Sequence, residues 1–371
     1  MSVKWFDKKA FEIGEYMADN VREIAKRAKV SAATVSRVMH QAENVKPETK
    51  ERVEAAMREL GLSADKLVRS AKKENHVIGV LVPDLTNSFF IELIQGIEEI
   101  AEEIGIRIII CHTKESDKLE TQYLRLLKDI HVGGIIITPT SDDDDSINNE
   151  YLNLLSNMKI PVVLLDRDVK YLKYSGIFID NERGAFEATQ LLLSNGHRKI
   201  ALIGGPLNTV PGRGRREGYL NAFKLMDVPV CEEIMFEGDF SINSGMKITE
   251  QIINDHPDVS AIFSSNNHMT IGCLKKLKEM GLSVPKDISV VGFDDLKRMN
   301  FNNQADNITV VDRPTNEMGI QAIKMMNKIL NGKTEMERRI ILMPKMAVRG
   351  SEKLLETNRG IKYLEERKNN I

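Results

Sequence analysis

Two kinds of hydrophobic pattern divide the chain. Between residues 20 and 62, apolar positions such as Val21, Ile24 and Ala28 recur at helical spacing, and short polar turns separate three such runs. From about residue 76 onward, short β-branched runs alternate with longer helical stretches. The first pattern predicts a small all-α domain. The second predicts an α/β architecture in which helices cover both faces of parallel sheets.

The α/β pattern occurs twice, which predicts two similar lobes. The first four strands are expected at residues 77–82, 106–111, 134–138 and 162–166. The pattern restarts with expected strands at residues 177–180, 200–205, 261–265 and 288–295. Two final strands near 309–311 and 340–343 flank a helix at 316–330, so we expect the chain to recross between the lobes.

The apolar pattern of the helical region predicts a helix, a tight turn and a second helix. Residues 29–31 interrupt the first helical run, and Ser31 suits the N-cap of the next helix because its hydroxyl can accept a free amide hydrogen. Thr34, Ser36 and Arg37 lie on the face opposite the apolar residues of that helix. Short polar groups and one guanidinium on a slender helix suit entry into a DNA major groove.

The average charge conceals an uneven distribution. The 371 residues carry a net charge of −2, with 42% hydrophobic and 29% charged residues, which is an ordinary globular balance. Residues 20–73, however, contain 13 Lys and Arg against 7 Asp and Glu, a net charge of +6, and residues 74–371 carry −7. The basic region coincides with the helix-turn-helix pattern, which favours a nucleic-acid-binding head on an acidic body.

Other function classes lack their motifs. The sequence has neither a run of about 18 apolar residues nor a secretory signal, so we expect a cytoplasmic protein. Its three cysteines are far apart and its seven histidines are scattered, which predicts no disulfide framework and no metal site. The glycines of residues 212–218 and 331–334 do not match nucleotide-binding loops. Neither an enzyme nor a cofactor is predicted.

The helical motifs resemble those of a known family. The segment IAKRAKVSAATVSRVM, followed by VKPETKERVEAAMRELG with a third helix from Pro47, is similar to the headpiece of the lactose/galactose-repressor (LacI/GalR) family. The resemblance implies DNA contacts by Ser31, Ala32, Ala33, Thr34, Ser36, Arg37, His40, Leu67, Arg69 and Ala71.

Three positions depart from the family's pattern. Lys29 stands where the family usually has a turn glycine, and His40 replaces an asparagine. Ala71 stands where the family has a leucine that wedges between base pairs, so we expect a shallower kink or a different wedge such as Leu67. Residues 63–75 could instead form a plain linker.

The body resembles the effector domain of the same family, which has the periplasmic sugar-binding-protein fold. The matching segments are VPDLTNSFF, IPVVLLDRD, GRGRREGY, SSNNHMTIG and VVGFDD, and most of them end a predicted strand, where open parallel sheets bind ligands. The resemblance implies an effector site formed by Asn87, Phe89, Phe90, Asp166, Arg167, Arg215, Phe240, Asn266, Asp294 and Asp312. Asn267 departs from the aspartate that the family usually carries there.

The chemistry of these effector-site residues suits a polyol. Aromatic rings can stack on a sugar ring, while carboxylates, amides and guanidinium groups can bond its hydroxyls. Because two arginines lie near the expected cleft, a phosphorylated or carboxylate-bearing sugar is also compatible.

The predicted organisation has five segments. They are an N-terminal extension (1–19), a headpiece (20–62), a hinge (63–75), a two-lobed effector-binding and dimerisation domain (76–349) and a tail (350–371). The resemblance implies a homodimeric transcription regulator, a repressor by preference, that binds a near-palindromic DNA operator under control of a small effector.

The sequence leaves two rival functions open. It also leaves open whether the effector weakens or strengthens DNA binding. A nucleotide-dependent enzyme is opposed by the glycine spacing, and a transport-type sugar-binding protein is opposed by the headpiece. Whether the effector acts as inducer or co-repressor is not encoded in these motifs.

Overall fold

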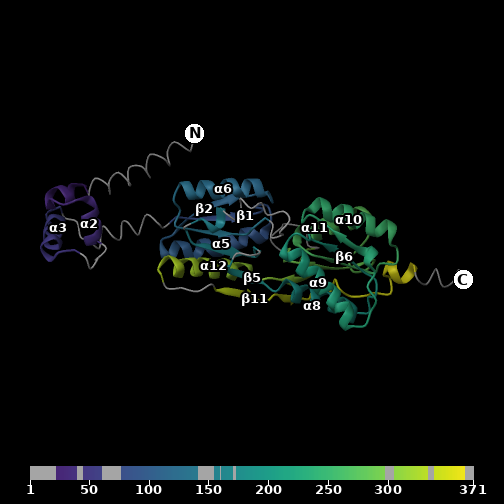
Figure 1. The fold of residues 1–371 in the computed structure, drawn as a ribbon. Coiled ribbons are helices and arrows are strands. Elements are labelled where there is room, and N and C mark those ends of the chain that lie inside the picture. The colour runs from purple at the N-terminus through teal and green to yellow at the C-terminus, as the bar shows by residue number, and fades with distance from the viewer. Residues whose placement is uncertain are drawn as a thin grey trace. The chain divides into compact units, whose positions relative to one another are not determined.

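The computed structural model describes residues 22–39, 45–60, 77–140, 154–158, 160–169, 173–296, 305–332 and 338–363 (Figure 1). The chain divides into two compact units, Met1–Val77 and Ile78–Ile371. The predicted N-terminal extension and hinge lie outside the described residues, as do His40, Leu67, Arg69 and Ala71.

The described part of the first unit consists of three helices around one core. A helix at residues 22–28 precedes α2 (Ala32–Met39) and α3 (Pro47–Glu59), and Pro47 occupies the first turn of α3, where its missing amide hydrogen costs nothing. The buried apolar residues are Ile24, Ala25, Ala28, Val35, Val38, Val53, Ala56 and Met57. This arrangement confirms the predicted three-helix domain.

The first lobe of the second unit is a six-stranded sheet. Its strands follow the order β11 (Arg339–Leu342), β5 (Ser175–Ile179), β4 (Val162–Leu165), β3 (Gly134–Ile137), β1 (Val77–Val82) and β2 (Arg107–His112). All strand pairs from β11 to β1 are parallel. Helix α6 (Asp117–Asp129) covers one face, and α5 (Ser88–Ile104) and α12 (Thr315–Leu330) cover the other (Figure 1).

The second lobe repeats this plan. Its strands follow the order β12 (Lys345–Ala347), β10 (Thr309–Asp312), β9 (Ser289–Phe293), β8 (Ala261–Ser264), β6 (Ile200–Gly204) and β7 (Met235–Glu237). Only β12 is antiparallel to its neighbour. Helices α8 (Asn181–Ser194) and α9 (Val210–Leu225) cover one face, and α10 (Ile242–Asp255) and α11 (Asn267–Glu279) cover the other (Figure 1). Short 3₁₀ turns occupy Glu232–Ile234 and Ala305–Asn307.

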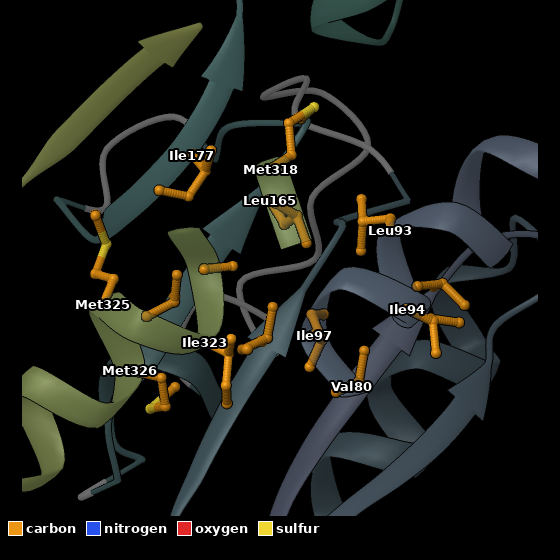
Figure 2. Close-up of a cluster of buried hydrophobic side chains, with 14 of the residues drawn as sticks. Val80, Leu93, Ile94, Ile97, Leu165, Ile177, Met318, Ile323, Met325 and Met326 are labelled. Atoms are coloured by element: carbon orange, nitrogen blue, oxygen red, sulfur yellow. The ribbon is translucent and has the colours of Figure 1, made fainter. Parts of the chain in front are cut away.

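Dense apolar packing joins the helices to the sheet in the first lobe. Val80, Leu165 and Ile177 of the sheet contact side chains of α5 and α12 such as Ile97 and Met326 (Figure 2). The two helices also approach each other closely, because a Cβ atom on Gly96 would lie 2.2 Å from the Asn316 carbonyl oxygen and one on Gly319 would lie 2.1 Å from that of Leu93. Glycine at both positions therefore permits this helix pair.

The chain crosses between the lobes three times. It enters the second lobe after β5, returns to the first between β10 and α12, and enters the second again between β11 and β12. The predicted recrossing is thus confirmed. The assignment of the strand at 177–180 to the second lobe is wrong, since β5 pairs with β4 and β11 of the first sheet. Strands β7 and β12 were not predicted, because each has only three residues.

Candidate functional site

A cavity of about 460 Å³ lies between the two lobes of the second unit. Its walls come from segments that directly follow parallel strands, including Pro83 after β1, His112 at the end of β2, Asp166 after β4 and Asp294 after β9. Both sheets direct their carboxyl ends toward this cavity, which is where open α/β sheets bind ligands. Its volume falls in the range of small-molecule sites.

Nine of the ten predicted effector-site residues line the cavity. They are Asn87, Phe89, Phe90, Asp166, Arg167, Arg215, Phe240, Asn266 and Asp294. The exception is Asp312, which is an exposed residue at the end of β10 and is not part of the lining. The placement of Asp312 in the site is therefore wrong. Successive side chains of an extended strand point in opposite directions, so the neighbouring Arg313 occupies the cavity instead.

Arg313 links the two lobes through their strand-end carboxylates. Its Nη1 donates to Asp166 Oδ1 of the first lobe at 2.6 Å, and its Nη2 donates to Asp294 Oδ2 of the second lobe at 2.8 Å. Its guanidinium lies 3.6 Å from the centre of the Phe89 ring, so that face of Phe89 is not open to a sugar ring. Arg313 was not predicted as a site residue, although its position directly after a predicted strand could have indicated it.

Arg167 is held by a carboxylate at the entrance. Its two terminal nitrogens each donate to an oxygen of Glu115 at 2.8 Å, and Nη1 also donates to the carbonyl oxygens of Pro139 and Thr140 at 3.2 and 2.9 Å. This bidentate geometry fixes the plane of the guanidinium. Glu115 has a left-handed backbone with φ of 50° and was not predicted as a site residue.

Arg215 bonds neutral groups. Its Nε donates to Asn181 Oδ1 at 2.9 Å, its Nη1 donates to the Ser265 carbonyl oxygen, and its guanidinium lies 3.8 Å from the centre of the Phe293 ring. Burial, followed by the nearby charge of Arg313, lowers the pKa of Arg215 to about 9. The nearby carboxylates of Asp294 and Asp166 oppose this lowering of the pKa of Arg215.

Five residues that line the cavity have left-handed backbones: Lys114, Glu115, Asp166, Phe240 and Asp294. Asp166 and Asp294 have φ values of 65° and 73°, and Phe240 has φ of 66°. Aspartate tolerates this region, whereas a bulky aromatic residue rarely adopts it. Gly205 leaves the space for the Phe240 ring, since a Cβ atom there would lie 2.2 Å from the ring. Such strain at a cavity wall is typical of a binding site.

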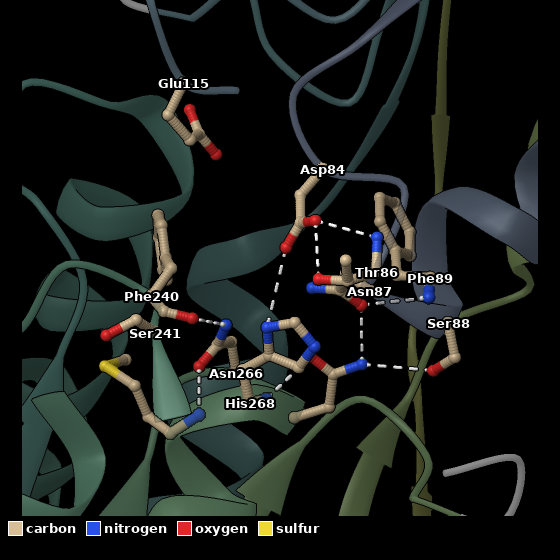
Figure 3. A network of polar contacts seen from close by, with 12 residues as sticks. Asp84, Thr86, Asn87, Ser88, Phe89, Glu115, Phe240, Ser241, Asn266 and His268 are labelled. Atoms are coloured by element: carbon tan, nitrogen blue, oxygen red, sulfur yellow. Dashed lines mark hydrogen bonds and ion pairs between the residues drawn. The ribbon is translucent and has the colours of Figure 1, made fainter. Parts of the chain in front are cut away.

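Polar contacts cross between the lobes beside the cavity (Figure 3). Asn267 Nδ2 donates to Asn87 Oδ1 at 2.7 Å and to Ser88 Oγ at 3.3 Å, and His268 Nδ1 lies 3.6 Å from Asp84 Oδ2. An aspartate in place of Asn267 could not donate these hydrogen bonds, so the departure from the family's pattern has a structural consequence.

The predicted DNA-contacting face lies on α2. Ser31 Oγ accepts from the Thr34 amide at 3.2 Å, which confirms the predicted N-cap. Ala32, Ala33 and Arg37 are exposed, and Thr34 is half-buried. The side chain of Ser36 lies outside the described residues.

The turn before α2 has the conformation that a glycine would favour. Lys29 has φ of 52°, so it adopts the left-handed backbone that the comparison with a turn glycine suggested.

Metal-ligating clusters and membrane-spanning helices are both absent from the described residues. The described ranges contain no group of three His, Cys, Asp or Glu side chains that could hold a metal ion. No helix in the same residue ranges has the length and apolar character needed to cross a bilayer.

A helix-turn-helix unit on the same chain as a two-lobed domain with an internal polar cavity is typical of two-lobed binding proteins that carry a DNA-binding headpiece. Residues 75–348 match the family described as "Periplasmic binding proteins and sugar binding domain of LacI family", and residues 20–64 match "Bacterial regulatory proteins, lacI family". The chain belongs to the LacI family of bacterial regulatory proteins.

Full-length relatives support this assignment. The chain is 31% identical over 344 residues to the HTH-type transcriptional regulator DegA of Bacillus subtilis (strain 168), across 92% of this chain and 100% of that one. DegA is named as a transcriptional regulator, and a ribose operon repressor from Halalkalibacterium halodurans is 32% identical over 334 residues, 90% of this chain and 97% of that one.

Solved structures have the same architecture. A transcriptional regulator CelR–cellobiose complex aligns with a TM-score of 0.67 and 28% identity over 89% of this chain and 99% of that chain. A LacI family transcriptional regulator from Enterococcus faecium with bound ribose aligns with a TM-score of 0.66 and 27% identity over 75% and 99%.

Proposed function

We propose that this protein is a sequence-specific transcription regulator, acting as a repressor, whose affinity for operator DNA is controlled by a small sugar-type effector bound between the lobes. The observation that carries the proposal is the presence, on one chain, of a capped α2 with an exposed face and of a polar cavity walled by both lobes. Its site of action is the cytoplasm, where operator DNA is accessible.

On the DNA side, α2 enters the major groove. Arg37 supplies the guanidinium for a base edge, and Ala32 and Ala33 supply methyl contacts to thymine. Ser31, Thr34 and Ser36 contact bases or phosphates, and the predicted hinge residues Leu67, Arg69 and Ala71 reach the minor groove. One headpiece makes few contacts, so a homodimer reads a near-palindromic site with two.

On the effector side, ligand binding selects one arrangement of the lobes. Asp166 and Arg167 come from the first lobe, and Arg215, Asn266 and Asp294 come from the second, so a ligand that bonds both sets favours the closed cavity. A ligand changes operator affinity only through its different affinity for the two states. Arg313 in the crossing segment bonds one carboxylate of each set.

The test is a mobility-shift assay on operator fragments selected from genomic DNA by the full-length protein. Each selected fragment is titrated with the protein in the presence and absence of neutral and charged sugars. We expect a retained fragment with a near-palindromic sequence and a change in its affinity with at least one sugar. Failure to select any preferred fragment contradicts the DNA-binding function, whereas sugar-independent binding contradicts the effector control.

A further inference from the structure

Acidic side chains compensate the basic side chains of the cavity lining. The acids are Asp84, Glu115, Asp166, Asp239 and Asp294, and the bases are Lys114, Arg167, Arg215 and Arg313. The three arginines are at most 6% exposed, and a buried cation is unfavourable unless a negative charge compensates it. Asp166 and Asp294 bond Arg313, and their charges also act on Arg215. The bidentate partner of the third buried cation, Arg167, is Glu115.

Glu115 differs from the two buried aspartates in its exposure and its backbone. Its side chain is 39% exposed, whereas those of Asp166 and Asp294 are 5% and 7% exposed. Lys114 and Glu115 have φ values of 55° and 50°, which two consecutive residues other than glycine rarely adopt. This strained turn between β2 and α6 brings the Glu115 carboxylate from the rim of the cavity to the buried Arg167.

The guanidinium of Arg167 is held on several sides but keeps a donor for a ligand. Nη1 and Nη2 each donate to one oxygen of Glu115 at 2.8 Å, and Nη1 also donates to the Thr140 carbonyl oxygen at 2.9 Å. Thr140 is fixed in turn, because its amide and hydroxyl donate to the buried Glu120 at 2.8 and 2.6 Å. Nε of Arg167 is buried and has no hydrogen-bond partner in the described part of the chain.

The charge state of Arg167 depends on Glu115. Burial lowers the pKa of Arg167, but the charge and hydrogen bonds of Glu115, followed by the charges of Asp166 and Glu120, outweigh burial and raise this pKa. Removal of the Glu115 charge would therefore deprive a buried guanidinium of its bidentate anionic partner. Such a guanidinium can instead pair with a carboxylate or phosphate group of a ligand.

Building on the proposed function, we propose that Glu115 is a specificity-determining residue: it pairs with Arg167 as a built-in anion, so that the cavity selects uncharged sugars over sugars with a carboxylate or phosphate group. A sugar hydroxyl can both accept from a free guanidinium donor and donate to a carboxylate. A fully ionised group can only accept, so it competes with Glu115 for Arg167 or lies beside a like charge. Glu115 thus acts on the class of ligand through Arg167.

Isothermal titration calorimetry on the full-length protein tests this role with probes that differ in charge. The probes are D-ribose, D-ribonate, D-ribose 5-phosphate and inorganic phosphate, the last of which requires no particular sugar skeleton. The decisive comparison is between the wild type and Glu115→Gln, which removes the negative charge and nearly keeps the shape. We expect the variant to bind at least one anionic probe about tenfold or more tightly than the wild type does, with no comparable gain for D-ribose.

Asp117→Asn is the matched control for Glu115→Gln. Asp117 is the first residue of α6, is exposed, and is not part of the cavity lining. Its substitution removes the same charge two residues away from Glu115, so a general decrease in repulsion between the protein and anions would affect both variants. We expect Asp117→Asn to bind the anionic probes as weakly as the wild type, because Arg167 keeps its partner.

Three outcomes overturn the inference without touching the proposed function. The first is tighter binding of D-ribonate or D-ribose 5-phosphate than of D-ribose by the wild type, a comparison that stands even where Glu115→Gln fails to fold. The second is an unchanged affinity of Glu115→Gln for every anionic probe. The third is an equal gain in Glu115→Gln and Asp117→Asn, because the anions would then respond to overall charge. Operator binding and its response to a sugar would keep the proposed function intact in each case.

Discussion

The exposed face of α2 and the wall of the cavity use charged and polar groups in opposite ways. Ala32, Ala33 and Arg37 on α2 are exposed to solvent. Asp166 and Arg313 in the cavity are 4% and 6% exposed and bond each other. A side chain on the α2 face can change without disturbing a neighbour in the core. A side chain of the cavity wall holds others in place, so its loss changes both binding and stability.

The largest loss in the free energy of unfolding is expected from Arg313→Ala. The variant leaves the Asp166 and Asp294 carboxylates buried without their partner, which costs about 3–5 kcal/mol of the free energy of unfolding. Chemical denaturation followed by circular dichroism measures this loss, and calorimetry measures the accompanying loss of effector binding.

Arg339→Ala provides the matched control for Arg313→Ala. Arg339 is 44% exposed and pairs with Asp168 at the surface, so its removal should cost about 1 kcal/mol or less. Equal losses in the two variants would show that burial of the Arg313 network has no special role.

A smaller effect, which also arises in the two-lobed unit, is the dependence of the free energy of unfolding on pH. His197 is fully buried between Ser260 Oγ and the Glu352 carbonyl oxygen, and burial lowers its pKa from 6.5 to about 4. The unfolded chain binds a proton below pH 6.5 that the folded protein does not bind until about pH 4. The contribution of His197 to the free energy of unfolding is therefore fully present above pH 6.5. It decreases as the pH falls from 6.5 to about 4, by about 3 kcal/mol in total.

The His197→Gln variant isolates this contribution. We expect its free energy of unfolding, measured by denaturant titration at pH 7, 5.5 and 4, to fall less steeply with acidification than that of the wild type. Parallel pH profiles for the two proteins would contradict the assignment of a neutral, buried His197.

Among these variants, Arg37→Ala is expected to have the smallest effect on the free energy of unfolding. Loss of one guanidinium that reads a base edge should weaken discrimination between operator and altered sites by about 1–3 kcal/mol. Because Arg37 is exposed, the free energy of unfolding and effector binding should remain at wild-type values. Competition mobility-shift assays measure the discrimination, and unchanged operator preference would remove Arg37 from the recognition face.

Much of the headpiece is local in origin and could therefore be predicted. Ser31 caps α2 through a contact three residues away, and the core of Ile24, Val35 and Val53 follows the helical spacing of apolar positions. The positive φ of Lys29 also agrees with the comparison to a turn glycine. Such features depend on neighbours along the chain, so the amino-acid pattern is sufficient to indicate them.

The cavity was predictable in part. The rule that ligands bind after parallel strands located Asn87, Asp166 and Asn266, because strand ends are visible in the pattern. The hydrophobic pattern assigned β5 to the wrong lobe, since a β-branched run does not specify which sheet it joins. The resemblance to the family placed Asp312 in the site instead of Arg313, because the side on which a strand's last side chain lies depends on the register of β10 with its neighbours.

The sequence by itself determined the two-part organisation, the capped recognition helix and the residue types at the strand ends, since these follow from local spacing and composition. Only the tertiary structure decided how the buried charges pair. Asp166, Asp294 and Arg313 are separated by up to 147 residues and meet because three crossings bring both sheets' carboxyl ends to one cavity.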